Sequence, residues 1–283
     1  MKELLNLYNP PKFSNLSDFF RHRNPGERVA LKGVSGSSLS LTIAKLDECL
    51  VEHQLFILPD RESAAFLYHD LELLLDDNGK ELVDKKIHYY PSSFRRVYKY
   101  DEIDKANVKL RSEMINKLIH GKDKYWIVTY PEAIAEKLVS YKYLKSNSFT
   151  IKKGELLPID IFLEFLYEYQ YRQEEFVFES GQFAWRGGIF DLYSFSEEHP
   201  FRIELSGDYV ESIRQFDPGT QLSVREADEL TIMPMVNHAE MKEERVSFFD
   251  FLNGNPDLWL MKVDDLARQI ELNFEKVEQE YEN

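Results

Sequence analysis

The 283-residue sequence lacks the patterns that mark several classes of enzyme and secreted protein. It contains one cysteine, Cys49, which excludes an internal disulfide framework and fits a reducing compartment. Because Cys49 lies on an apolar helical pattern, we expect a buried thiol there and no catalytic nucleophile. The seven histidines are scattered without an H-E-x-x-H pattern or a Cys/His cluster, and no G-x-S-x-G elbow occurs. The sequence therefore predicts neither a metal site nor a familiar nucleophile arrangement.

Long apolar runs and a signal peptide are also missing. No apolar run approaches the ~20 residues needed to span a bilayer, and the N-terminal stretch MKELLNLYNP lacks the apolar segment of a signal peptide. We therefore expect a cytoplasmic protein without membrane contact. The sequence stops on a charged helical pattern without an obvious terminal cap, which suggests a piece of a longer protein.

Positive charge is scarce in the middle of the chain. The formal net charge is -15, and residues 149–234 hold 7 Lys and Arg against 17 Asp and Glu. Broad contact with nucleic-acid phosphates needs clustered Lys and Arg, so this balance argues against it. Residues 1–148 are nearly neutral and leave room for a local basic patch. With 43% hydrophobic and 14% aromatic residues, the chain can still bury a substantial core.

The first 148 residues predict an α/β domain. Short apolar runs alternate there with helical patterns, which is typical of a parallel sheet covered by helices. Helices are expected from Leu39 to Leu50 and from Phe66 to Leu75. The predicted strands are 28–34, 55–59, 86–91 and 125–131.

The pattern of apolar runs changes near residue 149, where we place a domain boundary. A helical pattern over 158–171 leads into several short strands that Gly, Pro and Ser turns separate. A mostly antiparallel α+β unit is therefore expected over 149–234, inserted into the first domain. Residues 235–283 hold one more strand, 258–263, and a helix after it. A lone strand and helix cannot bury both faces, so we expect this segment to return and complete the first sheet.

The stretch KGVSGSSLS, residues 32–40, looks like an unfinished phosphate-binding loop. In the pattern G-x-x-x-x-G-K-[ST], glycines admit backbone N–H groups to the phosphate, lysine neutralises charge and the hydroxyl holds magnesium. Gly33 and Gly36 begin the pattern and Ser40 keeps the hydroxyl. Ser38 replaces the second glycine, and Leu39 replaces the lysine. We therefore expect an inactive loop and no cofactor for this chain, with weak residual phosphate or nucleotide binding as the alternative.

The run HYYPSSFRRVYKY, residues 88–100, mixes aromatic and basic side chains. Rings that stack on bases, beside cations that meet phosphate, are what contact with a single strand of nucleic acid uses. The same pattern fits packed rings with solvated cations at the end of a strand, and both interpretations stay open. The candidate nucleic-acid contacts are Tyr89, Tyr90, Arg95 and Arg96.

Two arginines of the inserted unit, Arg186 and Arg202, stand in the strand patterns AWRGGIFDLY and PFRIELSGD. Both are expected to project from strands of one small sheet, because alternating apolar residues follow each of them. Arginine is enriched in protein interfaces, where its planar fork makes directed bonds to carboxylates while its stem packs. In so acidic a segment, both arginines could equally pair internally. The acidic candidates for internal pairing are Glu204, Asp208 and Glu211.

The stretch GQFAWRGGIFDLY…PFRIELSGDYVESIRQFDPGTQLS closely resembles the module that the excinuclease subunit UvrB shares with the transcription-repair coupling factor Mfd. The shared pattern is G-x-F-x-x-R-G-G-x-x-D-[IL]-[FY], then a strand with R-[IV]-E, then G-D-x-[IV]-x-S-I-R-x-F-D. The degenerate loop, IVTYPEAI and SFTIKKGELL stand in the family's order, so the resemblance covers essentially the whole chain. The N-terminal module of Mfd fits better than UvrB, which has an intact phosphate loop and a long aromatic hairpin.

The resemblance implies a fold and a function. The fold is a degenerate P-loop, RecA/helicase-like parallel-sheet domain (domain 1a, 1–148; domain 1b, 235–283) with an inserted α+β interaction domain (domain 2, 149–234). The function is that of a non-catalytic docking module, which recruits UvrA in transcription-coupled nucleotide excision repair. In the family, the ATP- and Mg²⁺-dependent motor and the parts that contact RNA polymerase and DNA lie outside this module.

The resemblance also implies site residues. Family residues that bind UvrA fall on Arg186 and Arg202. A third family position, commonly aromatic, falls on Ser206, a departure that affects the apolar part of the contact. Arg214 is a weaker candidate by neighbourhood. The competing hypotheses are a residual nucleotide-binding or hydrolysing domain, and a DNA-binding helicase-like domain that uses residues 88–100.

Overall fold

The computed structural model describes residues 2–94, 104–120, 123–195, 197–232, 245–252 and 256–281. The chain divides into two compact units. The first unit holds residues 1–110, 120–137 and 247–283, and the second holds residues 111–119 and 138–246. Within the described residues, no helix is both long enough and apolar enough to cross a membrane.

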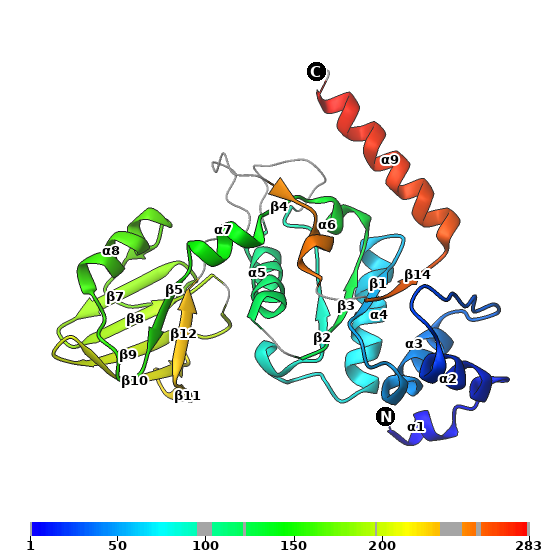
Figure 1. Ribbon diagram of the computed structural model, residues 1–283, viewed down its shortest axis with the longest axis horizontal. Coiled ribbons are helices and arrows are strands. Elements are labelled where there is room, and N and C mark those ends of the chain that lie inside the picture. Colours follow the sequence, from blue (N-terminus) through cyan, green and yellow to red (C-terminus); the bar gives the residue numbers. More distant parts are fainter. Residues whose placement is uncertain are drawn as a thin grey trace. The chain divides into compact units, whose positions relative to one another are not determined.

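A four-stranded parallel sheet lies at the centre of the first unit (Figure 1). Its strand order is β14-β1-β3-β2, with β1 (Gln54–Ile57), β2 (Ile87–Tyr89), β3 (Trp126–Thr129) and β14 (Asp257–Leu260). Every residue of β1 and β3 is buried, as expected for strands covered on both faces. The strand expected late in the sequence is β14, and it pairs in parallel with β1.

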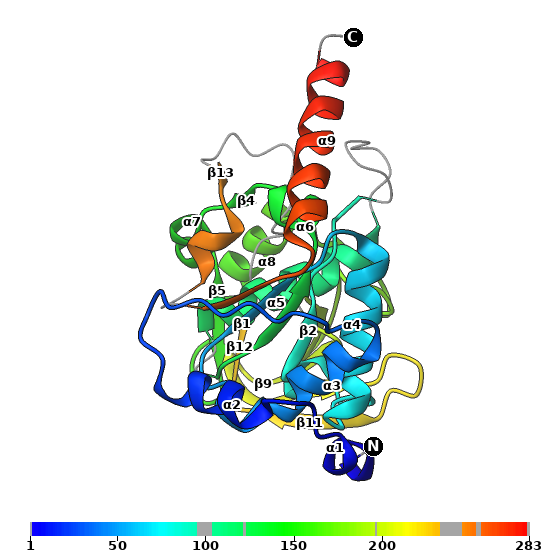
Figure 2. The same ribbon diagram turned by 90° about the vertical axis from the view of Figure 1, so that its right-hand side faces the viewer.

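Helices pack around this sheet (Figure 2). Asp60 starts α4, because its carboxylate accepts a hydrogen bond from the Ser63 backbone N–H at 2.8 Å. α4 packs against β2 and β3 and lies beside α3, while the far end of α9 projects from the rest of the unit. The helices of residues 2–135 and 248–281 are α1 (Lys2–Leu7), α2 (Phe13–His22), α3 (Ser37–Lys45), η1 (Asp47–Cys49), α4 (Arg61–Leu74), η2 (Leu82–Asp84), α5 (Lys105–His120), α6 (Pro131–Ala135), η3 (Phe248–Phe251) and α9 (Val263–Tyr281).

The strand predicted over 28–34 is absent, and this segment is irregular. None of its side chains is buried, although Val29 and Leu31 gave it the apolar pattern of a strand. Both edges of β1 are already taken, by β3 and β14, so the segment has no place beside β1. The residues before the degenerate loop therefore do not form the strand that a phosphate loop normally follows.

The second unit holds a six-stranded sheet in the order β11-β10-β9-β8-β7-β6 (Figure 1). Neighbouring strands are antiparallel except for β6 and β7. The six strands are β6 (Arg172–Gln173), β7 (Gln182–Arg186), β8 (Ile189–Tyr193), β9 (Phe201–Ser206), β10 (Tyr209–Phe216) and β11 (Ser223–Ala227). The other elements are β4 (Leu138–Val139) paired with β13 (Arg245–Val246), β5 (Phe149–Lys152) paired with β12 (Glu229–Ile232), α7 (Tyr141–Ser146) and α8 (Ile159–Glu168).

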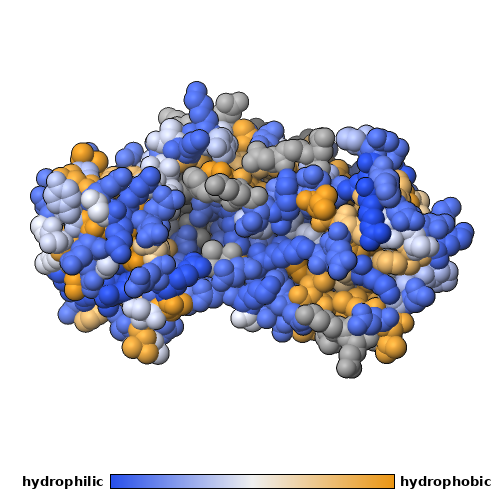
Figure 3. Space-filling model, turned by 60° about the horizontal axis from the view of Figure 1, so that its bottom comes forward, coloured by the Kyte–Doolittle hydropathy of each residue, from blue (hydrophilic) through white to orange (hydrophobic). Residues whose placement is uncertain are grey.

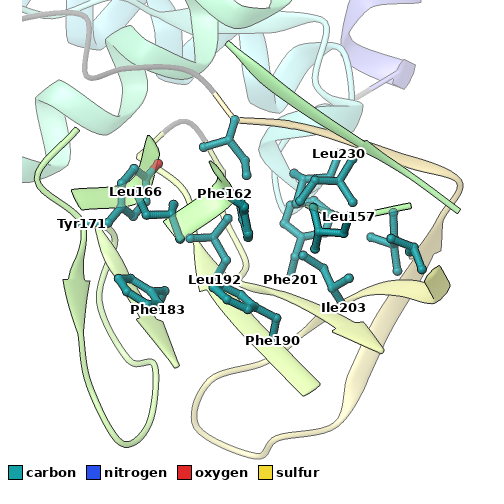
Figure 4. Close-up of a cluster of buried hydrophobic side chains, with 14 of the residues drawn as sticks. Leu157, Phe162, Leu166, Tyr171, Phe183, Phe190, Leu192, Phe201, Ile203 and Leu230 are labelled. Atoms are coloured by element: carbon teal, nitrogen blue, oxygen red, sulfur yellow. The ribbon is translucent and has the colours of Figure 1, made fainter. Parts of the chain in front are cut away.

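One face of the six-stranded sheet carries the core of the second unit (Figure 4). Alternate residues of β7, β8 and β9 point into it, and α8 contributes Phe162 and Leu166. The rings of Phe183 and Phe190 stack 5.6 Å apart, and Phe162 packs on Phe190 at 4.9 Å. Because side chains alternate along a strand, the residues between these core positions point to the opposite face. The parallel sheet and this second, antiparallel sheet confirm the fold class predicted from the sequence.

A histidine in the first unit gives a pH prediction. His53 is buried just before β1, and its Nδ1 accepts a hydrogen bond from the Tyr125 backbone N–H at 3.1 Å. Burial lowers the pKa of His53 below its usual value of 6.5. At low pH, the unfolded chain therefore binds a proton at His53 more tightly than the folded chain does. The contribution of His53 to folding stability is fully present above pH 6.5 and decreases as the pH drops below it. An NMR titration of the histidine ring protons should give His53 a pKa below 6.5, and a value at or above 6.5 would contradict this.

Candidate functional site

The arginines predicted as a site lie on the face of the second sheet that is turned away from its core. Asp191 on β8 pairs with Arg202 on β9, and Arg202 pairs with Arg214 on β10. Directly opposed residues of antiparallel strands share a face, so these side chains form a row across the sheet. Arg186 joins it from the end of β7, where it pairs with Ile189 of β8. We call this surface the arginine face: Arg186, Asp191, Arg202, Glu204, Ser206 and Arg214.

Asp191 holds the two predicted arginines together. Its Oδ1 accepts a hydrogen bond from Arg202 Nε at 2.7 Å, and its Oδ2 accepts one from Arg202 Nη2 at 2.9 Å and one from Arg186 Nη2 at 2.8 Å. The Asp191 side chain is 2% exposed, while those of Arg186 and Arg202 are 40% and 17% exposed. Two guanidinium groups thus share one buried carboxylate, which leaves the cluster with one surplus positive charge.

Further contacts fix the position of Arg186. Its Nη1 donates to the Glu175 carbonyl oxygen at 2.9 Å, and its guanidinium lies 4.8 Å from the centre of the Phe176 ring. The turn that follows favours glycine at both positions of the RGG motif. Gly187 has a φ of 58°, and a Cβ on Gly188 would lie 3.0 Å from the Leu205 carbonyl oxygen. The motif therefore allows β7 and β8 to turn tightly directly after Arg186.

Arg202 is held more firmly than Arg186. Its guanidinium lies 4.5 Å from the centre of the Phe216 ring, and Nη2 also donates to Gln221 Oε1 at 2.9 Å. Hydrogen bonding to Asp191 raises the pKa of Arg202 above its usual value, so its charge is permanent. This arginine presents a fixed positive edge on the face.

Arg214 has a carboxylate partner of its own. Its Nη2 donates to Glu204 Oε1 at 2.6 Å, and Ser212 Oγ donates to Glu204 Oε2 at 2.7 Å. Arg214 and Glu204 therefore form a neutral pair, in contrast to the surplus charge around Asp191. The internal pairing left open by the sequence thus exists, but Arg186 and Arg202 use Asp191 for it, which sequence reasoning had not singled out.

Ser206 lies at the exposed end of β9, beside the turn to β10. The residue before it, Leu205, packs against the buried core, so it adds no apolar surface to the arginine face. Ser206 instead pairs across the turn with Tyr209, whose side chain is exposed.

The hydroxyl groups of the degenerate loop make hydrogen bonds within the protein. Ser38 Oγ accepts a hydrogen bond from the Ser35 backbone N–H at 3.0 Å and donates to the Ser35 carbonyl oxygen at 2.6 Å. Ser40 is buried, and its hydroxyl donates to Asp70 Oδ2 of α4 at 2.7 Å. Gly33 and Gly36 keep positive φ values of 78° and 53°. The loop therefore has the backbone conformation that glycine allows, and the hydroxyl groups of Ser38 and Ser40 donate to oxygen atoms of the protein itself.

These contacts predict how the chain responds to nucleotide. We expect millimolar ATP with Mg²⁺ to leave the melting temperature unchanged, because Leu39 replaces the phosphate-binding lysine and Ser38 Oγ already accepts from a loop N–H. Binding at 100 times Kd would add about 2.7 kcal/mol of stability, which thermal unfolding detects easily. Salt at the same ionic strength is the control. A melting temperature that rises with ATP concentration would contradict the prediction.

The aromatic and basic run separates into described and undescribed residues. Tyr90 is fully buried, with its ring 4.4 Å from that of Phe248, so it is not free to stack on a base in this structure. Tyr89 packs between Tyr68 and Tyr130, at 5.6 and 6.3 Å, and burial raises its pKa. Arg95 and Arg96 lie outside the described residues.

Comparison with known proteins places the arginine face in a recognised domain. Residues 149–238 match the family described as the UvrB interaction domain. The arginine face lies entirely within this segment.

Longer similarities extend over both units. The transcription-repair-coupling factor of Staphylococcus haemolyticus is 29% identical over 240 residues, which is 80% of this chain and 18% of that protein. The UvrABC system protein B of Protochlamydia amoebophila is 25% identical over 234 residues, which is 80% of this chain and 34% of that protein. The chain thus spans about a fifth to a third of these relatives. The resemblance seen in the sequence is confirmed: the chain is similar to transcription-repair-coupling factors and to UvrABC system B proteins, and it contains a segment that matches the UvrB interaction domain.

Proposed function

We propose that this chain is a non-catalytic docking module of a transcription-repair coupling factor, and that it recruits UvrA in nucleotide excision repair. The observation that carries the proposal is the arginine face. Two partly exposed arginines share one buried carboxylate, within a segment that matches the UvrB interaction domain. The similarity to UvrABC system B proteins and coupling factors supports a role in nucleotide excision repair.

The geometry of the arginine face suits protein docking. Asp191 and Glu175 each accept a hydrogen bond from Arg186, which has five N–H donors. With 40% of its side chain exposed, Arg186 can still donate to a partner's carboxylate. Both guanidiniums are already held by Asp191, so less side-chain freedom is lost on binding. The surplus positive charge favours a UvrA surface that presents Asp or Glu.

The degenerate loop favours a coupling factor over a UvrB protein. Ser38 and Leu39 replace the glycine and lysine of a working loop, and the remaining hydroxyls are bonded internally. We therefore place ATP hydrolysis, with its Mg²⁺, in other parts of the parent protein. Contact with DNA and RNA polymerase belongs there as well in this proposal.

A calorimetric titration of the chain with UvrA of the same organism tests the proposal. We expect saturable binding, with a Kd of about 1 μM or tighter, as is common for a specific interface of standard size. Circular dichroism of the same sample establishes that the chain is folded. A folded chain that shows no binding would rule out the docking function for these 283 residues.

A further inference from the structure

Two large apolar side chains are exposed together at one end of the arginine face. Tyr209 is 56% exposed and Leu156 is 54% exposed, although each belongs to a regular, hydrogen-bonded part of the second unit. Burying such side chains is favourable, so a pair exposed beside the arginine face offers apolar contact area to a partner that docks there.

Strand register puts Tyr209 on the arginine face. Tyr209 pairs with Ser206, and Arg202 pairs with Arg214 further along the same two strands. The register shifts between Val210 and Ser212, so the buried Val210 still points into the core and Tyr209 points to the opposite face. Arg202 and Ser206 are four residues apart on β9, or roughly 13 Å, which one interface of standard size covers.

Backbone hydrogen bonds connect the segment around Leu156 to the segment around Tyr209. Leu156 forms an antiparallel bridge with Tyr209, in which Leu157 N–H donates to the Asp208 carbonyl at 2.8 Å and Val210 N–H donates to the Glu155 carbonyl at 3.0 Å. This is the arrangement in which opposed side chains of antiparallel strands lie closest. The backbone at Tyr209 is thus held on both sides. On one side it pairs with Ser206 across the turn, and on the other side it pairs with Leu156.

We propose that Tyr209, supported by Leu156, is the apolar anchor of the arginine face, and that it inserts into an apolar pocket of UvrA flanked by carboxylates. The inference rests on the proposed docking function and adds a second kind of contact to it. Tyrosine and arginine are the residues that most often dominate binding energy at protein interfaces. Tyrosine also brings a large contact area with few rotatable bonds.

The test compares UvrA binding by the whole chain and four variants, each checked by circular dichroism. Tyr209→Ser removes the ring, and Ser206→Tyr/Tyr209→Ser moves a ring across the turn to the opposed position on the same face. Tyr167→Ser is the matched control, because Tyr167 is 54% exposed on α8, which covers the other face of the sheet. Arg186→Ala/Arg202→Ala reports on the docking function itself.

We expect Tyr209→Ser to weaken binding about tenfold or more, the exchanged variant to regain most of the affinity, and Tyr167→Ser to bind within about twofold of the parent chain. If Tyr209→Ser binds like the parent while the arginine variant does not, the anchor is wrong and the docking function stands. If Ser206→Tyr/Tyr209→Ser binds UvrA as weakly as Tyr209→Ser, a ring on this face does not restore binding, and the proposal is overturned. If the parent chain itself does not bind, the docking function fails and the anchor fails with it.

Discussion

Replacing Arg186 and Arg202 together by alanine is expected to abolish UvrA binding while leaving the chain folded. Both side chains are partly exposed, and neither belongs to the hydrophobic core of the second unit, so the core stays intact. The buried Asp191 carboxylate loses both ion-pair partners, so the double variant is expected to be folded but less stable than the parent chain. Truncating one partner of a buried, hydrogen-bonded charge pair at an interface costs about 2–5 kcal/mol. The double variant should therefore bind at least about 100-fold more weakly. Calorimetry measures the loss, and circular dichroism establishes the fold.

A charge-matched control separates the arginine face from a general loss of charge. Lys152→Ala/Arg225→Ala also removes two positive charges from the second unit, but from β5 and from the edge strand β11. We expect this variant to bind UvrA within about threefold of the parent chain. Equal weakening by the two double variants would show that net charge, rather than the arginine face, drives the association.

Replacing Asp191 by asparagine is expected to affect both stability and UvrA binding. The substitution keeps the shape of the side chain but leaves two guanidinium groups without their shared carboxylate. Breaking a buried ion pair from one side costs 3–5 kcal/mol, and we expect about 2 kcal/mol here because both arginines still reach water. Urea denaturation followed by circular dichroism measures this loss.

The binding effect of Asp191→Asn should depend on the two arginines. If Asp191 acts by holding them, the substitution weakens UvrA binding in the parent chain. In a background where one arginine is already alanine, the same substitution should then cost less, which a double-mutant cycle with Arg186→Ala measures. Equal losses in both backgrounds would show that Asp191 does not act through Arg186.

Much of the fold follows from the sequence, because local patterns carry it. The runs at 55–59 and 125–131 are almost wholly apolar, and they form the buried strands β1 and β3 within one or two residues. The run at 86–91 also holds Lys86 and His88, and it forms β2 with the same accuracy. The run at 28–34 has a similar pattern but forms no strand, because strand formation also depends on pairing with a neighbouring strand, which no local pattern reveals. The domain boundaries placed at 148/149 and 234/235 stay predictions.

The site was only partly visible in the sequence. Arg186 and Arg202 were found from their strand patterns and the family resemblance, whereas Asp191 was missed. Its signal was a lone acidic residue inside the apolar strand IFDLY, where an unpaired charge would be costly. The exposure of Tyr209 and the burial of Tyr90 both depend on strand register and long-range packing, which pairwise sequence spacing does not give.

The most direct test of this account is amide hydrogen exchange of the chain with and without saturating UvrA. The account predicts that UvrA slows exchange mainly in peptides from residues 182–216, above all at the two turns beside Arg186 and Tyr209, with little change at the degenerate loop. Slower exchange confined to residues 33–40 or to α9 would contradict it, and so would an unchanged pattern under conditions where UvrA binds.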